Sequence, residues 1–287
     1  MNNSYDFIIL FDVKNGNPNG DPNGNGGPRL HELSSYGYVT DVCLKSKIRR
    51  YVGITKQDVP GYKIYITENA ILELVNREER EKLGINADLL KKASKDGLDK
   101  LKLLQEHMCR EYFDIRTFGA VMIGKKEDIG HLTGPCQLSF AESVDPIISE
   151  EVTITRKAAT NEKEQVDKRN QTMGSKYIVP YALYKGFGHI SAPLANKTGF
   201  TEEDLNVLFE AMYNMFDFDK SSTRGEMAMR HLIIFKHESP LRNAPSHKLF
   251  DLVKITKLTD KEPASINDYE IEILDNPYEN VEIITIN

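Results

Sequence analysis

Hydrophobic and polar positions follow strand-like and helix-like patterns in turn along the chain. Residues 5–13 (YDFIILFDV) form a short apolar run, which predicts a buried strand. Thr40–Asp41 then provides a helix start. In the residues that follow, Leu44, Ile48 and Tyr51 share one stripe of a helix. We therefore expect an amphipathic helix over residues 41–52 that packs its apolar side on the strand.

The same patterns predict the remaining elements. Strands are expected over residues 62–67, 177–192, 229–237, 250–258 and 269–274. Two further strands, over residues 113–123 and 135–144, are expected to pair with each other. Helices are expected over residues 68–83, over 86–110 with a break at Gly97, and from a Thr201–Asp204 capping box to about residue 217. Long, regular helices between parallel strands are missing from this series. The pattern predicts an α+β sheet domain of ferredoxin-like type, elaborated by insertions.

Two polar segments interrupt this series. Residues 15–28 (NGNPNGDPNGNGGP) contain turn formers only, so we expect a long, tightly turning loop there. Its start imitates a calcium-binding loop, but Gly26 stands where the bidentate glutamate is needed. The exposed amides of this loop could contact RNA or a neighbouring subunit, but Asn/Asp-Pro-Gly sequences form turns first, so we interpret Asn17, Asn19 and Asp21 as turn residues. In residues 149–176 the hydrophobic periodicity fades, which indicates an insertion that projects from the core, partly as a hairpin.

The net charge of −6 is unevenly distributed over the 287 residues. Residues 259–287 hold eight acidic residues and one lysine, so this tail carries −7 and the other 258 residues together carry +1. The predicted helix at 41–52 has four basic residues and one acidic residue, a net charge of +3. Residues 156–176 have six basic and three acidic residues, which is also a net charge of +3. Phosphate binding depends on such local charge more than on the total. We interpret the acidic tail as a solvated surface.

Other features bear on location and chemistry. The three cysteines are far apart, and neither a signal peptide nor a membrane span is predicted, so we expect reduced thiols in a cytoplasmic protein. The sequence has no GxxxxGK[ST], CxxC or GxSxG motif, and its seven histidines are scattered. No catalytic residue, metal ligand or cofactor is therefore predicted.

One strand partly matches an RNA-recognition motif. Residues 185–190 (KGFGHI) fit its first four positions, but His189 and Ala192 replace the two later aromatic rings. We favour a buried strand whose glycines allow close packing. We also interpret Arg116 and Phe118 as structural. For Arg224, in the SSTRGE segment, an RNA contact and a solvated loop residue remain equally open.

Residues 11–29 (FDVKNGNPNGDPNGNGGPR) and 39–52 (VTDVCLKSKIRRYV) together resemble the major backbone subunit of the CRISPR Cascade surveillance complex, a member of the RAMP superfamily. Further stretches agree in order, at 114–122, 134–147, 172–184 and 242–250. The cysteine in TDVCLK favours the type I-C form over the type I-B form.

This resemblance implies one modified RRM-like domain over residues 1–287, with a mainly helical finger at 53–112 and a thumb hairpin at 149–176. Copies would stack head to tail along the CRISPR RNA (crRNA), join other Cascade subunits and present the spacer to target DNA. RNA contacts are expected first from Lys45 and Arg49, then from Lys47 and Arg50. In the thumb, the candidate contacts are Arg156, Lys157, Lys168, Arg169, Met173 and Lys176.

Two other functions remain as alternatives. A RAMP-type endoribonuclease could use Asp12 or Asp21, although neither has an evident partner in the sequence. A scaffold could instead direct its basic helix at acidic protein partners. Because type I backbone subunits leave cleavage to other subunits, the resemblance implies that this chain is not an enzyme.

Overall fold

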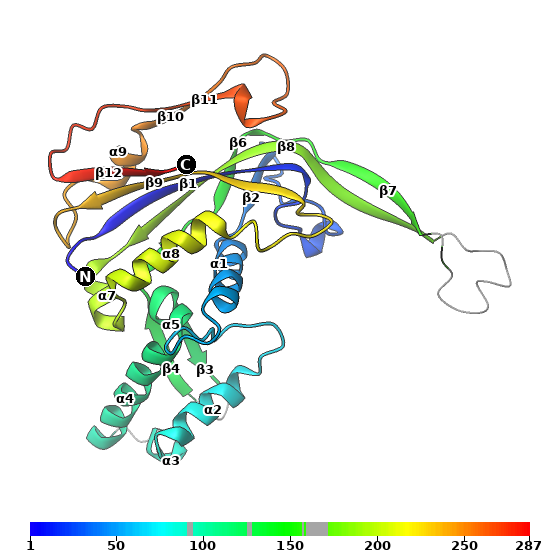
Figure 1. Cartoon of the computed structure of the whole chain (residues 1–287). Coiled ribbons are helices and arrows are strands. Elements are labelled where there is room, and N and C mark those ends of the chain that lie inside the picture. Colours follow the sequence, from blue (N-terminus) through cyan, green and yellow to red (C-terminus); the bar gives the residue numbers. More distant parts are fainter. Residues whose placement is uncertain (91–93, 125–127, 157, 159–171) are drawn as a thin grey trace.

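The computed structural model describes residues 1–90, 94–124, 128–156, 158 and 172–287, and an eight-stranded antiparallel sheet forms its centre (Figure 1). The strand order is β12-β9-β1-β8-β6-β2, and β5 and β7 also pair with β8. The strands are β1 (Tyr5–Gly16), β2 (Tyr36–Val39), β5 (Cys136–Leu138), β6 (Ala141–Pro146), β7 (Glu150–Arg156), β8 (Thr172–Ile190), β9 (Glu226–His237) and β12 (Val281–Ile286).

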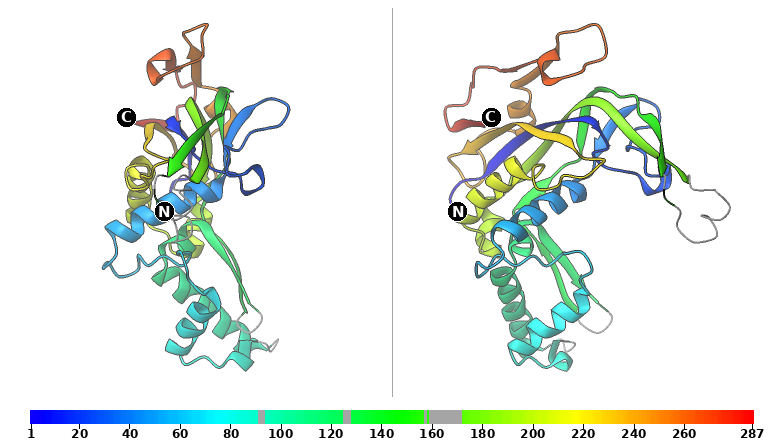
Figure 2. Two further views of the ribbon diagram at one scale, coloured as in Figure 1. Left: turned by 90° about the vertical axis from the view of Figure 1, so that its right-hand side faces the viewer. Right: turned by 45° about the vertical axis from the view of Figure 1, so that its right-hand side comes forward.

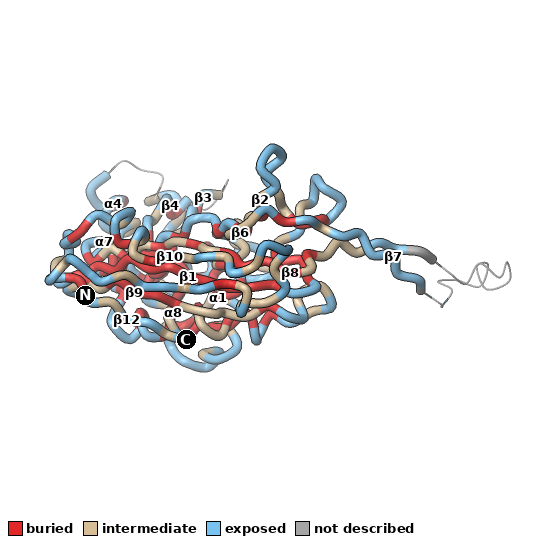
Figure 3. Tube along the Cα trace, turned by 90° about the horizontal axis from the view of Figure 1, so that it is seen from above, coloured by how far each residue is buried: buried red, intermediate tan, exposed pale blue. Residues whose placement is uncertain are grey.

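Strand β1 lies between β8 and β9 and is buried on both faces. Phe7 and Phe11 belong to the hydrophobic core on one face, whereas Ile8 and Leu10 belong to the core on the other. A strand covered on both sides needs a continuous apolar run rather than strict alternation. This explains why residues 5–13 are so uniformly apolar and confirms the predicted strand. In Figure 3, buried chain runs through the middle of the molecule.

Helices α1 (Asp41–Thr55), α7 (Ala192–Thr198) and α8 (Glu202–Asn214) cover one face of the sheet (Figure 1). The other face carries α9 (Ser246–Phe250) and the hairpin of β10 (Val253–Lys257) and β11 (Tyr269–Ile273). The predicted starts of two helices are confirmed. Thr40 accepts a hydrogen bond from the backbone N–H of Cys43, and Thr201 and Asp204 form a capping box. The predicted α+β class is also confirmed. Among the described residues, no helix is long and apolar enough to span a bilayer.

A side lobe projects from the helix-covered side of the sheet (Figure 1). It contains α2 (Leu72–Lys82), α3 (Ala87–Leu90), α4 (Lys95–Glu111), α5 (Phe113–Phe118) and the hairpin of β3 (Gly119–Ile123) and β4 (Asp128–Thr133). The lobe has its own hydrophobic core, in which Tyr65, Met108 and Ile129 are buried. Two short 3₁₀ helices, Pro22–Gly24 and Ile266–Asp268, lie elsewhere in loops.

In this lobe the predicted strand at 62–67 is wrong, and of the strand predicted at 113–123 only residues 119–123 form one, β3. Residues 113–118 form α5, and the buried Asp114 carboxylate on this helix accepts hydrogen bonds from the backbone N–H groups of Tyr65 and Ile66, at 2.8 and 3.1 Å. Those two N–H groups are thereby satisfied without a neighbouring strand, and residues 62–67 stay irregular with one bridge to Tyr112. Segment 135–144 pairs with β8 instead.

The structure also corrects the predicted helix break and the description of the tail. Gly97 lies in the first turn of α4, where its N–H donates to the Ser94 cap, so the break precedes it. The tail is not simply solvated, because β12 pairs with β9 from Val281↔His237 to Ile286↔Leu232.

Strand β8 extends well beyond the sheet and forms a hairpin with β7 (Figure 2). The pairing runs from Glu150↔Ile178 to Arg156↔Thr172. The described part of residues 149–176 therefore forms the expected hairpin. Residues 157 and 159–171, at its far end, lie outside the described residues.

A buried carboxylate in β1 attaches the C-terminal part of the chain to the sheet. Asp6 accepts hydrogen bonds from His189 on β8, His237 on β9 and Ser246 at the start of α9, at 2.5, 3.0 and 2.9 Å. Burial alone would raise the pKa of Asp6, but the two histidines and the nearby Arg242 guanidinium bring it well below its usual range. This network accounts for the position of residues 242–250.

The close approach of β8 to β1 yields a stability prediction. A Cβ atom at position 188 would lie 2.1 Å from Cζ of Phe7, which is fully buried and directly opposite Gly188 in the sheet. We expect Gly188→Ala to lower the free energy of unfolding by about 1–3 kcal/mol, because the ring has no room to move. Urea denaturation measures the change. Gly174→Ala is the control, since its Cβ would lie 3.6 Å from Ile154. Equal stability of the two variants would contradict this packing.

Candidate nucleic-acid-binding groove

Helix α1 combines a buried apolar side with two basic flanks. Leu44, Ile48, Tyr51 and Val52 are buried against the sheet and α8, as the predicted inward stripe requires. The basic side chains leave the helix on either side of this stripe. One flank faces α5 of the side lobe, and the other faces the loop between α8 and β9.

On the flank toward the side lobe, Lys45 and Arg49 are held by carboxylates. Arg49 Nε donates to Asp114 Oδ2 at 2.8 Å, and Lys45 Nζ donates to Asp41 Oδ2 at 2.8 Å. Both cations lie over the ring of Phe118, at 5.4 and 5.7 Å from its centroid. The carboxylate and the ring together fix the guanidinium in one orientation.

On the flank toward the α8–β9 loop, three cations surround one carboxylate. Lys47 donates to Asp219 Oδ2, Arg50 Nη1 donates to Oδ1 at 2.6 Å, and Arg224 Nε lies 2.8 Å from Oδ2. Arg50 also donates from Nη2 to Glu68 at 2.9 Å. Asp219 therefore connects both basic residues of this flank to the α8–β9 loop.

The exposed side of α1 forms the floor of a continuous groove, which we call the α1 groove. It consists of two adjoining hollows of about 580 and 530 Å³ that share Ser46, Arg49 and Ile66. Lys45 lines the first hollow and Arg50 the second. The remaining lining residues are Val42, Phe118, Gly119, Ala120, Val121, His131, Leu132, Thr133 and Gln137 in the first hollow, and Gly53, Ile54, Ile64, Thr67 and Glu68 in the second.

The lining suits a nucleic-acid backbone. Val42 and Val121 are 63% and 65% exposed there, which is unusual for residues of their type and leaves apolar contact surface for sugars or bases. Lys45 and Arg49 line the groove, but only 13% and 11% of their side chains is exposed, so a ligand must enter the groove to reach them.

The predicted contacts differ in how far the structure describes them. Lys45, Arg49 and Arg50 lie together along the α1 groove, whereas the Lys47 side chain is only 6% exposed and lines neither hollow. In the hairpin, Lys176 is half-buried opposite Val152. Of the other five hairpin residues, Arg156 and Met173 are described in their backbone only, and Lys157, Lys168 and Arg169 lie outside the described residues. All ten remain predictions as RNA contacts.

The asparagine-rich loop turns back on itself and supports the start of α1. Asn17 Nδ2 donates to the carbonyl of Gly26 at 2.8 Å, and Asn19 Oδ1 accepts from the backbone N–H of Thr40 at 3.0 Å. Asp21 accepts from the N–H of Asn23 and caps the first 3₁₀ helix. Each of these side chains therefore hydrogen-bonds to a backbone group, as expected for turn residues.

The open base-stacking face of an RNA-recognition strand is missing from the described part of β8. Phe187 stacks on Phe250 of α9 with ring centroids 4.6 Å apart, and His189 lies 5.7 Å from the same ring. Lys185 Nζ donates to the carbonyl of Val253 at the start of β10. This side of the strand is therefore covered by protein. The interpretation of residues 185–190 as a closely packed strand is confirmed.

The two aspartates considered for nuclease activity have structural partners. Asp12 is buried, lies 2.8 Å from Arg230 Nη2 and accepts from the hydroxyl of Tyr181 at 3.1 Å. Asp21 caps a turn, as described above. Among the described residues, no group of three or more histidine, cysteine or acidic side chains is arranged to hold a metal ion.

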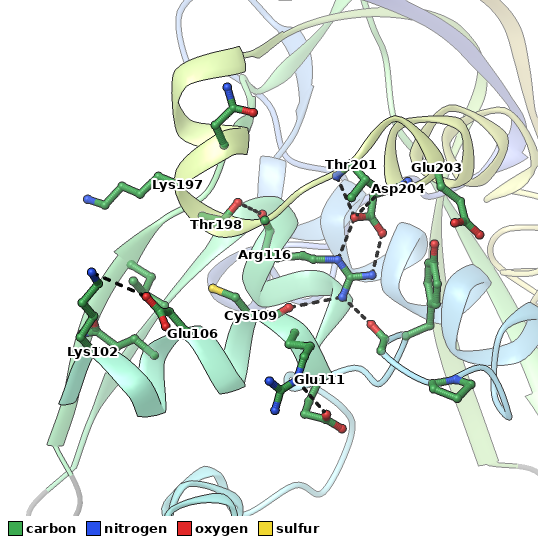
Figure 4. A pocket seen from close by; sticks show the side chains of 18 residues that line it. Lys102, Glu106, Cys109, Glu111, Arg116, Lys197, Thr198, Thr201, Glu203 and Asp204 are labelled. Carbon is green, nitrogen blue, oxygen red and sulfur yellow. Dashed lines mark hydrogen bonds and ion pairs between the residues drawn. The ribbon is translucent and has the colours of Figure 1, made fainter. Parts of the chain in front are cut away.

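A hollow of about 720 Å³ lies between α4, α5 and the α7–α8 connection (Figure 4). Its central cation, Arg116, donates to both oxygens of Asp204, at 2.9 and 2.6 Å, and to the carbonyl of Gly61. Burial raises the pKa of the Cys109 thiol to about 11, which disfavours the thiolate form. The predicted structural role of Arg116 is confirmed, but on α5 rather than on a strand.

Asp114 and Asp219 are the residues of this site that sequence analysis missed. Asp114 lies between Phe113 and Ile115, and Asp219 follows Phe218. An acid in a segment that must be buried needs a cationic or hydrogen-bonding partner. That signal indicates a partner, but not which of the 37 basic residues it is.

Comparisons with known proteins agree with this architecture. A chain of a "CRISPR RNA-guided surveillance complex, pre-nicking" is similar in fold, with a TM-score of 0.52 and 11% identity over 81% of this chain and 78% of that chain. A chain of another "CRISPR RNA-guided surveillance complex" has a TM-score of 0.46 and 12% identity over 81% of this chain and 68% of that one. A comparison with curated protein sequences found no match. The model of the family "CRISPR-associated protein Cas7" matches residues 3–274, so the chain belongs to the Cas7 family.

Proposed function

We propose that this Cas7 protein is a crRNA-binding backbone subunit of a type I Cascade complex. The observation that carries the proposal is the α1 groove, in a chain that belongs to the Cas7 family. The groove is continuous along one helix, has an apolar lining, and contains cations that buried carboxylates hold in place. Such a surface suits a polyanion with a regular backbone better than a compact small molecule.

The groove can bind RNA without reading its sequence. Arg49 and Arg50 would donate to phosphate oxygens, and Lys45 would act as a point charge beside them. Phosphate contacts fix position and register but carry no sequence information. Sequence would be read by base pairing between the spacer and target DNA, as in other RNA-guided systems.

In the assembly we propose, copies of the chain stack head to tail along the crRNA together with other Cascade subunits. The β7–β8 hairpin would be the thumb that reaches the next copy, and the side lobe, with residues 53–112, would be the finger. Contacts between unlike surfaces of identical chains do not close into a ring, which is what a filament needs. We assign the complex to the type I-C form on the residue matches at 11–29 and 39–52, and place it in the cytoplasm.

The competing function is a RAMP-type endoribonuclease. It would need a general base or a metal near the RNA. Asp12 is held by Arg230 and Tyr181, and Asp21 by its own turn. These contacts favour a subunit that binds RNA and leaves cleavage to other proteins.

The α1 groove gives a binding prediction. We expect Lys45→Gln to weaken RNA binding roughly 5- to 10-fold near physiological salt and to lower the slope of log K against log salt by about one unit. The loss should be the same for RNAs of unrelated sequence. Fluorescence anisotropy over a range of salt concentrations measures both quantities. Lys45 is preferred to Arg49 because removal of Arg49 would leave the buried Asp114 without its cation.

Lys56→Gln is the matched control, because Lys56 caps the C-terminus of the same helix and lines neither hollow. Equal losses in the two variants would mean that only total charge matters, which contradicts binding in the groove. A loss confined to some sequences would mean that Lys45 reads bases. A wild-type chain without salt-dependent RNA binding, alone or in the complex, would favour the scaffold that binds acidic proteins.

A second experiment tests the absence of catalysis. We expect purified protein to leave repeat RNA intact, with or without Mg²⁺, because the candidate aspartates are bound within the fold. Denaturing gel electrophoresis after prolonged incubation provides the measurement. Cleavage that disappears in Asp12→Asn, Asp21→Asn or a histidine variant would overturn the proposal and establish the nuclease.

A further inference from the structure

The loop between α8 and β9 brings an arginine to the end of the α1 groove. Its Asp219 carboxylate is 7% exposed and receives Lys47 and Arg50 from α1 and Arg224 from its own loop. The loop is attached at a second point, where the carbonyl of Thr223 accepts from the backbone N–H of Asn17 at 2.7 Å. The position of Arg224 is thus set by contacts with both α1 and the asparagine-rich loop.

This cluster has more positive than negative charge. Three cations share Asp219, and the only further carboxylate bound to any of them among the described residues is Glu68, on Arg50. The Glu68 side chain is 83% exposed, so solvent weakens its interaction. A buried carboxylate cannot balance three cations, and the surplus positive charge is available to an anion.

Two arginines of the cluster, Arg50 and Arg224, are partly exposed and present its surplus positive charge to solvent. The side chains of Arg50 and Arg224 are 39% and 33% exposed, whereas Lys47 is buried. Arg224 contacts Asp219 through Nε, so its terminal nitrogens remain to donate outward. Arg50 lines the α1 groove, which makes the cluster continuous with it.

We propose that Arg50 and Arg224 form a second phosphate-binding site on the RNA path, and that Asp219 is the positioning residue that holds them. This inference rests on the proposed function, since the ligand is a phosphate of the RNA in the α1 groove. A guanidinium fixed by a carboxylate loses little further freedom when it binds phosphate, so the arrangement favours affinity. Lys47 is buried behind the two arginines and contributes positive charge without contacting the RNA.

The first test compares two loop variants that remove the same charge. We expect Arg224→Gln to weaken RNA binding roughly 5- to 10-fold and to lower the salt slope by about one unit. Lys220→Gln should change affinity less than about twofold, because Lys220 is held by Asp217 and the carbonyl of Met227 and takes no part in the cluster. Anisotropy titrations with one RNA at several salt concentrations provide both quantities.

The second test separates positioning from simple charge. Asp219→Asn makes the protein more positive by one unit, so long-range electrostatics alone predicts tighter RNA binding. Positioning predicts weaker binding, because the two arginines lose their common anchor. Circular dichroism and thermal melting show whether the variant is folded. If the Asp219→Asn variant is unfolded, the comparison of Arg224→Gln with Lys220→Gln alone tests whether the second phosphate-binding site exists.

The outcomes separate this inference from the proposed function. If wild-type protein binds RNA but Arg224→Gln binds equally well, or Lys220→Gln loses as much, the second site is wrong and the α1 groove stands. Tighter binding by a folded Asp219→Asn protein would remove the positioning role. A wild-type protein that does not bind RNA would overturn the proposed function together with this inference.

Discussion

The arrangement of this molecule depends on the burial of positive charge beside negative charge around one helix. Helix α1 carries four basic residues, and it lies between the sheet and the side lobe, where water is partly excluded. A cation in such a place is costly unless a carboxylate accompanies it. Asp114 provides that carboxylate from the side lobe, and Asp219 provides it from the α8–β9 loop. The same two ion pairs therefore attach α1 to both of its neighbours.

This constraint also explains where a polyanion can bind. The sheet face next to β8 is occupied by α9 and β10, whose Phe250 ring covers Phe187 and His189. The open side of α1, by contrast, retains cations whose orientation is already fixed. The proposed RNA contacts are therefore on a helix rather than on the strands, and are made to the RNA backbone rather than by base stacking. A subunit that must accept any guide sequence needs this kind of contact.

Local signals in the sequence predicted much of this, and long-range contacts determined the rest. The apolar stripe of α1, its Thr40 cap and the buried run of β1 follow from residues close in sequence, and all three are present. Segment 113–118 was misassigned, and its Asp114 acts on backbone groups 48 and 49 residues earlier. Lys47 and Asp219 are 172 residues apart, so no local pattern could pair them. The sequence alone therefore does not show which basic side chains are held by a buried carboxylate and which are unpaired in solvent.

The net charge of −6 conceals a separation of charge in space. The tail that carries −7 forms β11 and β12, which lie above and at the edge of the sheet, whereas α1 lies on its opposite side (Figure 1). Of the carboxylates near α1, Asp114 and Asp219 are buried and orient cations rather than repel a ligand, whereas Glu68 is 83% exposed. The net charge of the chain is therefore no measure of the charge at the α1 groove.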